Sequence, residues 1–286
     1  MKVHLVDGTY ELFRAFYSPG KPSGEWGATK GFLRSMISML RRDDVTHVGV
    51  AFDTVIESFR NELFDGYKTG EGIDPELKAQ FPMVERAAEA LGMVVWRMIE
   101  FEADDAIAAA AVKFIEAPEV EQSVICTPDK DLSQVARGKE IILWDRRRDR
   151  FMDEAHLTEK FGVPPASIPD YLALVGDPQD GIPGIPRWGA KSAAQILTAY
   201  GTLETIPEDP SDWSVPIRGK AKLSENLRAE WPEALLYRRL ATLRLDAPIP
   251  ESLDAMRWAG PADDKLAALA TDIEDRSIFD RVEALR

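Results

Sequence analysis

The stretch MVVWRMIEFEADDAIAAAAVKFI, residues 93–115, decides the fold of this chain. Its apolar beginning predicts a strand from Met93 to Met98, and its alanine-rich end predicts a helix from Ala103 to Ile115. The turn between them leads into three acids, which are Glu102, Asp104 and Asp105. A strand, a turn and a helix in this order are the repeating unit of a parallel α/β sheet.

The same order recurs along the first half of the chain. Further strands are expected at 2–6, 46–52, 123–126 and 140–144, and further helices at 29–42 and 82–91. The strand at 140–144 is expected to be the last one in the chain. We therefore predict an α/β fold with a doubly wound, mainly parallel sheet. The ligand crevice of such a sheet lies beyond the carboxyl ends of its strands.

The second half of the chain, from about residue 166, is helical and rich in loops. The segment GIPGIPRWGAKSAAQILTAYG runs from Gly181 to Gly201 and predicts a tight hairpin between two helices, the second of which begins near Ala190. Backbone N–H groups at this helix start, assisted by Lys191 and Ser192, suit a phosphate of a nucleic acid. The hairpin can equally be read as a plain helical connector.

Nine acids follow the predicted strands or precede the hairpin, and they are Asp7, Asp53, Glu102, Asp104, Asp105, Asp129, Asp131, Asp177 and Asp180. Any one of them can be read as a turn former or a helix cap. Four groups of acids arriving at one sheet edge, however, repel each other unless cations neutralise them. We therefore expect these carboxylates to converge and to bind metal ions.

Composition excludes several other classes of protein. The net charge of −14 argues against a generally basic surface that coats nucleic acid, although local basic segments can still contact phosphates. Cys126 is the only cysteine and the three histidines are scattered, which disfavours a disulfide and a zinc site. The sequence has no export signal and no apolar stretch of membrane length, so we expect a soluble, cytoplasmic protein. We also expect it to be a monomer.

Five sequence blocks occur in an order and at spacings that resemble the 5′ nuclease family. They are LVDGTYELFRAFY, VAFDTVIESFRNELFDGYK, EADDAIA, TPDKDL and GDPQDGIPGIPRWGAKSA, and they span residues 3 to about 200. This family comprises 5′-3′ exonucleases and flap endonucleases, including the N-terminal domain of bacterial DNA polymerase I. The chain is expected to be a free-standing member, with a functional link to a DNA polymerase.

The resemblance implies a PIN-like nuclease fold and hydrolysis of DNA at 5′ ends, flaps or nicks, in replication or repair. Family members use two divalent ions, Mg²⁺ or Mn²⁺, and a metal-activated water. On matching positions, Asp7, Asp53 and Asp104 serve the first ion, helped by Glu102 and Asp105, while Asp129, Asp131, Asp177 and Asp180 serve the second. The implied domains are a nuclease domain at 1–165 with an arch at about 64–82, a helix-hairpin-helix module at 166–230, and C-terminal helices at 231–286.

The resemblance also implies DNA contacts. Lys68 approaches the scissile phosphate and acts in catalysis with Asp7 and Asp104, Tyr67 stacks on a base, and Arg14 and Arg60 steer phosphate. In the hairpin the matching positions are Gly184, Arg187, Gly189, Lys191 and Ser192.

Four positions depart from the family pattern. Glu71 stands where an arginine is expected, Gly181 replaces an asparagine, and Arg187 and Trp188 replace a glycine and an isoleucine. The family hairpin can hold a monovalent ion such as K⁺, and Arg187 puts that ion in doubt. Arg187 is then expected to carry positive charge to DNA directly, and Trp188 to pack into the hairpin.

Three other classes of protein compete with the nuclease interpretation. A phosphatase of the haloacid dehalogenase type also begins with a strand ending in DGT, but it needs an aspartate where Leu5 stands. A ribonuclease of the PIN type is shorter and lacks the hairpin module. A non-catalytic binder of branched DNA that keeps the fold is the serious rival, and its mark would be missing carboxylates.

Overall fold

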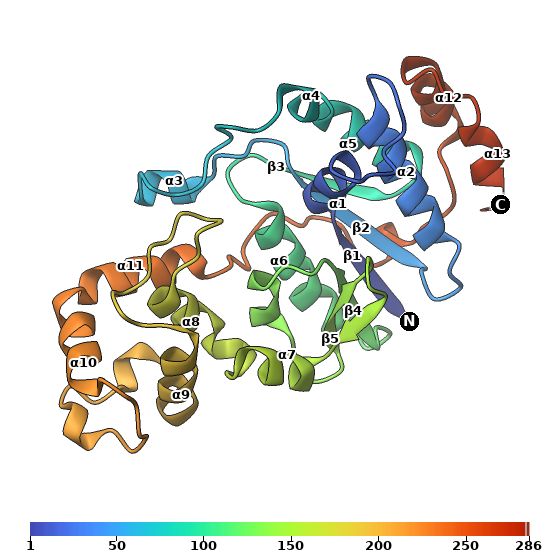
Figure 1. Cartoon of the computed structure of the whole chain (residues 1–286). Coiled ribbons are helices and arrows are strands. Elements are labelled where there is room, and N and C mark those ends of the chain that lie inside the picture. Colours follow the sequence, from blue (N-terminus) through green and yellow to red (C-terminus); the bar gives the residue numbers. More distant parts are fainter. Residues whose placement is uncertain (284, 286) are drawn as a thin grey trace. The chain divides into compact units, whose positions relative to one another are not determined.

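The computed structural model describes residues 1–283 and 285 and divides the chain into two compact units. The first unit contains Met1–Ser58, Gly70–Thr127 and Arg244–Arg286, and the second contains Phe59–Thr69 and Pro128–Leu243. Figure 1 shows the helices and strands of both units.

Four parallel strands form the sheet of the first unit, in the order β3-β2-β1-β4. They are β1 (Lys2–Asp7), β2 (His47–Asp53), β3 (Val94–Met98) and β4 (Gln122–Cys126). The inner strands β1 and β2 are buried along almost their whole length, as parallel strands covered on both faces should be. Because Asp7 pairs with Ala51 in the register, Asp7 and Asp53 both stand at the carboxyl edge of the sheet.

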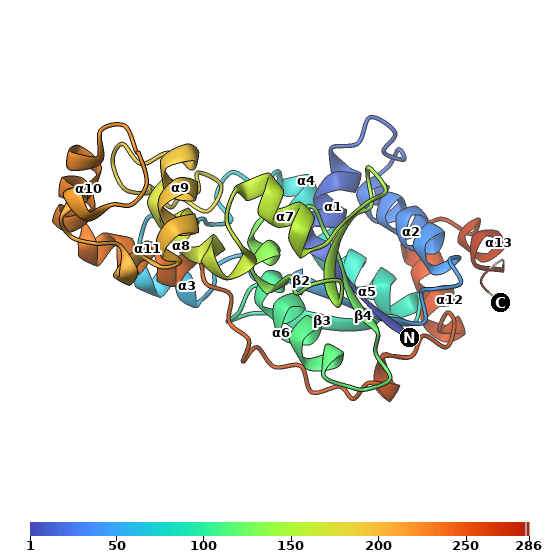
Figure 2. The same cartoon turned by 90° about the horizontal axis from the view of Figure 1, so that it is seen from below.

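Helices cover both faces of this sheet. Helix α6 (Ala103–Ile115) packs along all four strands on one face, while α1 (Gly8–Phe16) and α2 (Gly27–Leu40) lie on the other, as Figure 2 shows. Almost every residue of α6 as far as Ala111 is buried, and its alanines let the helix lie close to the strands. The predicted doubly wound, mainly parallel fold is thus confirmed.

The other helices of the first unit extend its outer layer. Helix α5 packs on α2 and β3, and α12 packs on α5. The bounds of this second group are α4 (Pro75–Lys78), α5 (Phe81–Ala90), η5 (Asp254–Met256), α12 (Asp263–Asp272) and α13 (Ile278–Glu283).

The second unit contains an antiparallel pair, β5 (Ile141–Asp145) and β6 (Arg150–Met152). The expectation that the strand at 140–144 ends the series is therefore wrong. Strand β6 has only three residues, too few for an alternating pattern to be recognised. The chain reverses near Asp149, which adopts a φ of 47° and accepts the Trp144 indole N–H at 3.0 Å.

The rest of the second unit is helical and has a hydrophobic core of its own. Helices α8 (Ile168–Val175) and α9 (Ala190–Tyr200) enclose the hairpin and confirm the predicted helix-hairpin-helix. Buried side chains of α8, α9, α10 and α11 form the core, together with Trp188 and Trp213. The predicted boundaries at 165 and 230 stay predictions.

The remaining elements of the second unit are α3 (Phe59–Leu63), η1 (Asp131–Val135), α7 (Glu154–Phe161), η2 (Pro165–Ser167), η3 (Leu203–Thr205), η4 (Pro210–Asp212), α10 (Lys220–Ala229) and α11 (Trp231–Ala241). Across residues 1–283 and 285, no helix is both long enough and apolar enough to cross a membrane.

Candidate metal-binding carboxylates

Two acids of the first unit end neighbouring strands and are held by hydrogen bonds. Asp7 caps α1 by accepting the Tyr10 N–H at its Oδ1, at 2.8 Å, while its Oδ2 accepts the Thr127 hydroxyl at 3.1 Å. Asp53 accepts the N–H of Ala103, the first residue of α6, at 2.7 Å. At the carboxyl edge, these bonds join the end of β1 to the residue after β4, and the end of β2 to the start of α6, which follows β3.

Glu102 and Asp105 form a capping box at the start of α6. The Glu102 N–H donates to Asp105 Oδ2 at 3.0 Å, and the Arg244 N–H donates to Asp105 Oδ1 at 2.8 Å. Both oxygens of the fully buried Asp105 thus accept backbone donors, which favours a capping role over a ligand role for this residue. Glu102 accepts the Ser58 hydroxyl at 2.8 Å, and Asp104 is half-buried in the first turn of α6.

The second unit brings three acids into one group. Asp131 lies in η1, while Asp177 and Asp180 lie in the turn after α8, and one oxygen of each lies within 4.8 Å of the others. The buried atoms Asp131 Oδ1 and Asp177 Oδ2 accept no hydrogen bond. Asp129 stands beside this group, and its Oδ1 accepts the Asp131 N–H at 2.9 Å. We call Asp131, Asp177 and Asp180 the carboxylate group.

Two lysines place positive charge at the carboxylate group. The Lys130 ammonium forms ion pairs with Asp131 Oδ1, at 3.7 Å, and with Asp177 Oδ2. The Lys68 ammonium lies 2.9 Å from Asp180 Oδ1. Burial lowers the pKa of Lys130, but the Asp131 and Asp177 carboxylates outweigh burial and raise that pKa.

The electrostatics of the carboxylate group suit a hard divalent cation. Burial, together with the charges of Asp129, Asp180 and Asp177, raises the pKa of Asp131 well above its usual range, against the opposing effect of Lys130. The acids therefore destabilise one another even with the lysines present. Carboxylate oxygens gathered within reach of one point are the ligands that Mg²⁺ and Mn²⁺ prefer.

Two family models together match residues 2–264. The N-terminal resolvase-like domain of 5′-3′ exonucleases matches residues 2–162, and the C-terminal SAM fold of 5′-3′ exonucleases matches residues 163–264. The chain belongs to the 5′-3′ exonuclease family.

Individual relatives agree with this membership. DNA polymerase I of Bacillus caldotenax is 32% identical over 292 residues, and that of Mycobacterium leprae is 34% identical over 293 residues. These matches cover 99% and 98% of this chain but 32% and 31% of the relatives, so the chain spans about a third of their length. A flap endonuclease of bacteriophage T5, solved as a pseudo-enzyme-product complex with DNA and metal ions, has the same fold: its TM-score is 0.66 at 22% identity, over 100% of this chain and 99% of that one.

Two residues that the exonuclease pattern assigns to DNA contact are buried here. Arg60 is 1% exposed, and its guanidinium donates to the carbonyls of Leu240 at 2.8 Å and Thr242 at 3.1 Å. Tyr67 is 4% exposed and belongs to the core of the second unit. These contacts favour structural roles, so neither residue is part of the DNA surface that we propose.

Arg14 also has a structural contact. Its guanidinium pairs with the fully buried Glu11 and donates to the Ser35 hydroxyl at 2.6 Å. Loss of Arg14 would remove an ion pair of a buried carboxylate, which is destabilising. The role of Arg14 in steering phosphate stays a prediction, and so does the effect of Glu71, which is exposed.

The exonuclease hairpin is shaped by its glycines and by a cap. Gly184 adopts a φ of 74°, and a Cβ there would lie 2.5 Å from the backbone nitrogen of Gly176, so no other residue fits without displacement. Gly189 is the N-cap residue of α9 and exchanges two hydrogen bonds with the Ser192 hydroxyl, at 3.1 and 3.0 Å. Lys191 is exposed. Trp188 is buried in the core, as predicted.

Three polar residues beside the acids were not predicted from the sequence. Thr127 and Ser58 donate to Asp7 and Glu102, and Lys130 contacts the carboxylate group. Thr127 and Lys130 belong to the TPDKDL block, in which Lys130 stands between Asp129 and Asp131 and Thr127 stands two residues before Asp129. Their places in this block were the available signal for both.

Proposed function

We propose that this chain hydrolyses DNA phosphodiesters at 5′ ends or 5′ flaps and requires divalent cations to do so. Membership of the 5′-3′ exonuclease family supports the reaction class. The single observation that carries the metal requirement is the carboxylate group, in which one oxygen of each of the three acids lies within 4.8 Å of the others. The T5 relative, which was solved with DNA and metal ions, supports the substrate class.

Two sets of side chains would hold the ions. Asp7, Asp53, Asp104 and Glu102 form the set of the first unit, and the carboxylate group with Asp129 forms the set of the second. Mg²⁺ or Mn²⁺ is the expected metal, and when bound it would supply an activated water and stabilise negative charge on the phosphate.

The chain's own residues would keep the ligands in place and add charge. The hydroxyls of Thr127 and Ser58 orient Asp7 and Glu102, in the way that outer partners orient metal ligands. Lys68 would stabilise the charge that grows on the phosphate. A role in replication or repair beside a DNA polymerase is supported by the DNA polymerase I relatives. A cytoplasmic location and a monomeric state stay predictions.

The proposal is tested with an end-labelled 5′-flap substrate and a nicked duplex. We expect labelled products with Mg²⁺ and none when a chelator replaces it, and the product lengths separate exonuclease from endonuclease action. Full activity in chelator would exclude the metal mechanism. Retention of flap DNA without product at every Mg²⁺ and Mn²⁺ concentration would instead identify the non-catalytic binder of branched DNA.

The substitution Lys68→Ala should lower cleavage by roughly 100- to 1,000-fold at saturating Mg²⁺ and DNA, the usual effect of losing one preorganised charge partner of a transition state. Rates are measured by single-turnover quench, and DNA affinity by fluorescence anisotropy. Lys78→Ala removes an exposed lysine in α4 and serves as the matched control. Equal losses in the two variants would contradict a specific role for Lys68.

A further inference from the structure

Lys130 pairs with two members of the carboxylate group. It is the N-cap residue of η1, and its carbonyl accepts the Ser133 N–H at 3.0 Å, so its backbone is fixed at the start of that helix. Its ammonium forms ion pairs with Asp131 Oδ1, at 3.7 Å, and with Asp177 Oδ2. The proposed nuclease function uses Lys68 and leaves Lys130 without a role.

The carboxylates that Lys130 contacts are ones that a metal ion would also need. Asp177 Oδ1 accepts the Gln179 N–H at 3.1 Å, and its Oδ2 pairs with Lys130. One oxygen each of Asp131, Asp177 and Asp180 lies within 4.8 Å of the others, so an ion held between them meets the same carboxylates as the ammonium. Two cations this close repel each other. Lys130 therefore competes with a divalent ion for the carboxylate group.

The Lys130 side chain has a way out of this competition. It is 30% exposed, whereas the side chains of Asp131 and Asp177 are 12% and 3% exposed. A lysine has a flexible four-carbon stem, so rotation of the stem carries the ammonium from the acids into water while η1 stays in place. The buried acids stay behind, and with no cation between them they repel one another.

We propose that Lys130 is a built-in counter-cation of the carboxylate group, and that its ammonium moves away from Asp131 and Asp177 when a divalent ion binds. The inference rests on the proposed metal-dependent function and adds the residue that sets the affinity of this site for its ion. Lys130 is a positioning residue, because it acts through the carboxylates. It stabilises them in chelator, and the need to break its two ion pairs weakens binding of the ion.

Lys130→Met tests both parts of the proposal, because methionine keeps an unbranched stem and removes the charge. In chelator the unfolding temperature should fall by roughly 2–4 °C, since Asp131 and Asp177 lose a cation. The dissociation constant for Mn²⁺ should nevertheless become about tenfold smaller, because two partly buried ion pairs no longer oppose the ion. Unfolding is followed by circular dichroism. Free Mn²⁺ is counted by electron paramagnetic resonance while the full chain is titrated without DNA.

The direction of the affinity change separates this role from a purely structural one. A residue that only supports the fold would weaken Mn²⁺ binding when it is lost, or leave it unchanged. Either result overturns the proposal. The carboxylates of the first unit are intact in Lys130→Met, so only one of the two expected binding events should become tighter.

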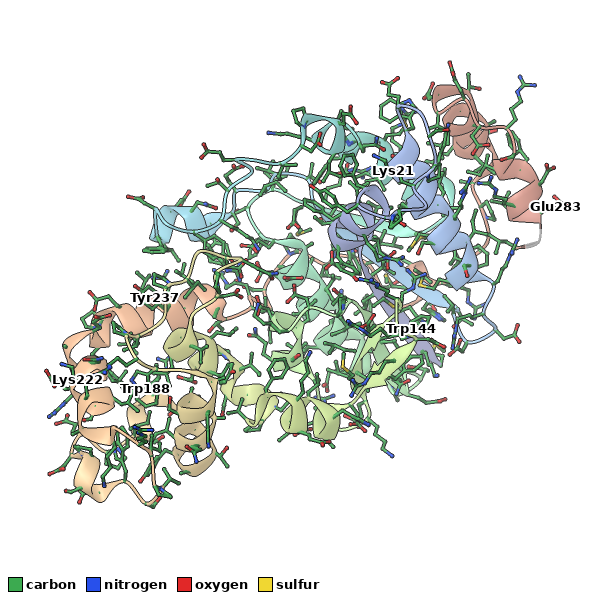
Figure 3. The ribbon with its side chains drawn as sticks, in the orientation of Figure 1. Lys21, Trp144, Trp188, Lys222, Tyr237 and Glu283 are labelled. Carbon is green, nitrogen blue, oxygen red and sulfur yellow. The ribbon has the colours of Figure 1, made fainter. Side chains whose placement is uncertain are left out.

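The matched control is Lys222→Met. Lys222, labelled in Figure 3, lies in α10, and its ammonium pairs with Glu225 at 2.7 Å. The control therefore also removes an ion-paired lysine from the second unit, but none that pairs with the carboxylate group. Its Mn²⁺ affinity should equal that of wild-type protein. An equal gain in both variants would assign the effect to the net charge of the chain and overturn the proposal.

Further variants locate the effect at the carboxylate group. Lys130→Arg keeps a cation beside the acids, so its Mn²⁺ affinity should stay close to that of wild-type protein. Lys130→Met combined with Asp131→Asn removes a ligand as well, and the tenfold gain should disappear. A gain in Lys130→Arg, or one that persists with Asp131→Asn, overturns the proposal. If Lys130→Met does not fold, Lys130→Gln removes the same charge and is held to the same expectations.

Failure of this inference is distinct from failure of the proposed function. If wild-type protein binds Mn²⁺ and cleaves DNA but Lys130→Met binds Mn²⁺ no more tightly, only the role of Lys130 is lost. Wild-type protein that binds no Mn²⁺ overturns the metal requirement itself, and the role of Lys130 with it.

Discussion

Asp131→Asn should abolish metal-dependent cleavage and at the same time stabilise the metal-free protein. Asp131 is 8% exposed, and burial and the neighbouring acids raise its pKa. A neutral amide of the same shape removes repulsion with Asp129, Asp177 and Asp180 but also removes an oxygen ligand. We expect cleavage to fall by more than about 100-fold, since loss of an outer partner of a metal ligand already costs 10- to 100-fold. The unfolding free energy in chelator should rise by roughly 1 kcal/mol, because like charges at this spacing are destabilising.

Thermal unfolding with and without Mg²⁺ separates these effects. A ligand that binds only the folded state raises the unfolding temperature, so Mg²⁺ should stabilise wild-type protein and stabilise Asp131→Asn much less. Asp145→Asn is the control. Asp145 is also buried, and burial raises its pKa, but the ion pair with Arg148 at 2.9 Å and the hydrogen bonds that Asp145 accepts lower that pKa overall. That variant should lose stability in chelator and keep its response to Mg²⁺. A full Mg²⁺ response in Asp131→Asn would contradict the ligand role.

The sequence predicted the parallel sheet and the acids at its carboxyl edge because both depend on local pattern. Apolar runs such as VHLV before Asp7 and VGVAF before Asp53 mark buried strands, and in parallel strands the following residues reach one edge. Which acids remain available to a ligand depends on distant backbone donors. Asp105 resembles Asp104 in sequence, yet its Oδ1 accepts the N–H of Arg244, which is 139 residues away.

The same limit applies to the basic and aromatic residues. Arg60 and Tyr67 stand in the same sequence block as Lys68, so motif context treats all three alike. Arg60 is buried because its partners are the carbonyls of Leu240 and Thr242, and no local pattern reveals a pairing over that separation. Lys68 keeps its ammonium at Asp180. The sequence therefore did not show that the charged side chain of Arg60 is buried.

The departure from the family pattern at Gly181 has a steric explanation. Gly181 adopts a φ of 74°, and a Cβ there would lie 2.0 Å from the carbonyl oxygen of Gly66. Only glycine lets residues 66–68 approach so closely. In this arrangement the Lys68 N–H donates to the Asp180 carbonyl at 3.0 Å, and the Lys68 ammonium reaches the Asp180 carboxylate at 2.9 Å. Glycine in place of asparagine thus fixes Lys68 beside the carboxylate group.

Gly181→Asn, which restores the residue usual in the family, should therefore harm this protein. We expect a loss of about 1–3 kcal/mol of unfolding free energy, the usual cost of forcing extra atoms into a packed site. Cleavage should also fall, because Lys68 has to move away from Asp180. Asparagine tolerates left-handed backbone better than most residues, so the cost arises mainly from the clash with Gly66.

Gly219→Asn separates the clash from the backbone conformation. Gly219 adopts a φ of 75°, nearly the same as Gly181, but a Cβ there meets no atom within 4 Å. Chemical denaturation of both variants, compared with wild-type protein, gives the two losses of unfolding free energy. The loss should be clearly larger for Gly181→Asn, and only that variant should lower the cleavage rate at saturating DNA. Equal losses would assign the effect to the positive φ alone and contradict the steric role of Gly181 in placing Lys68.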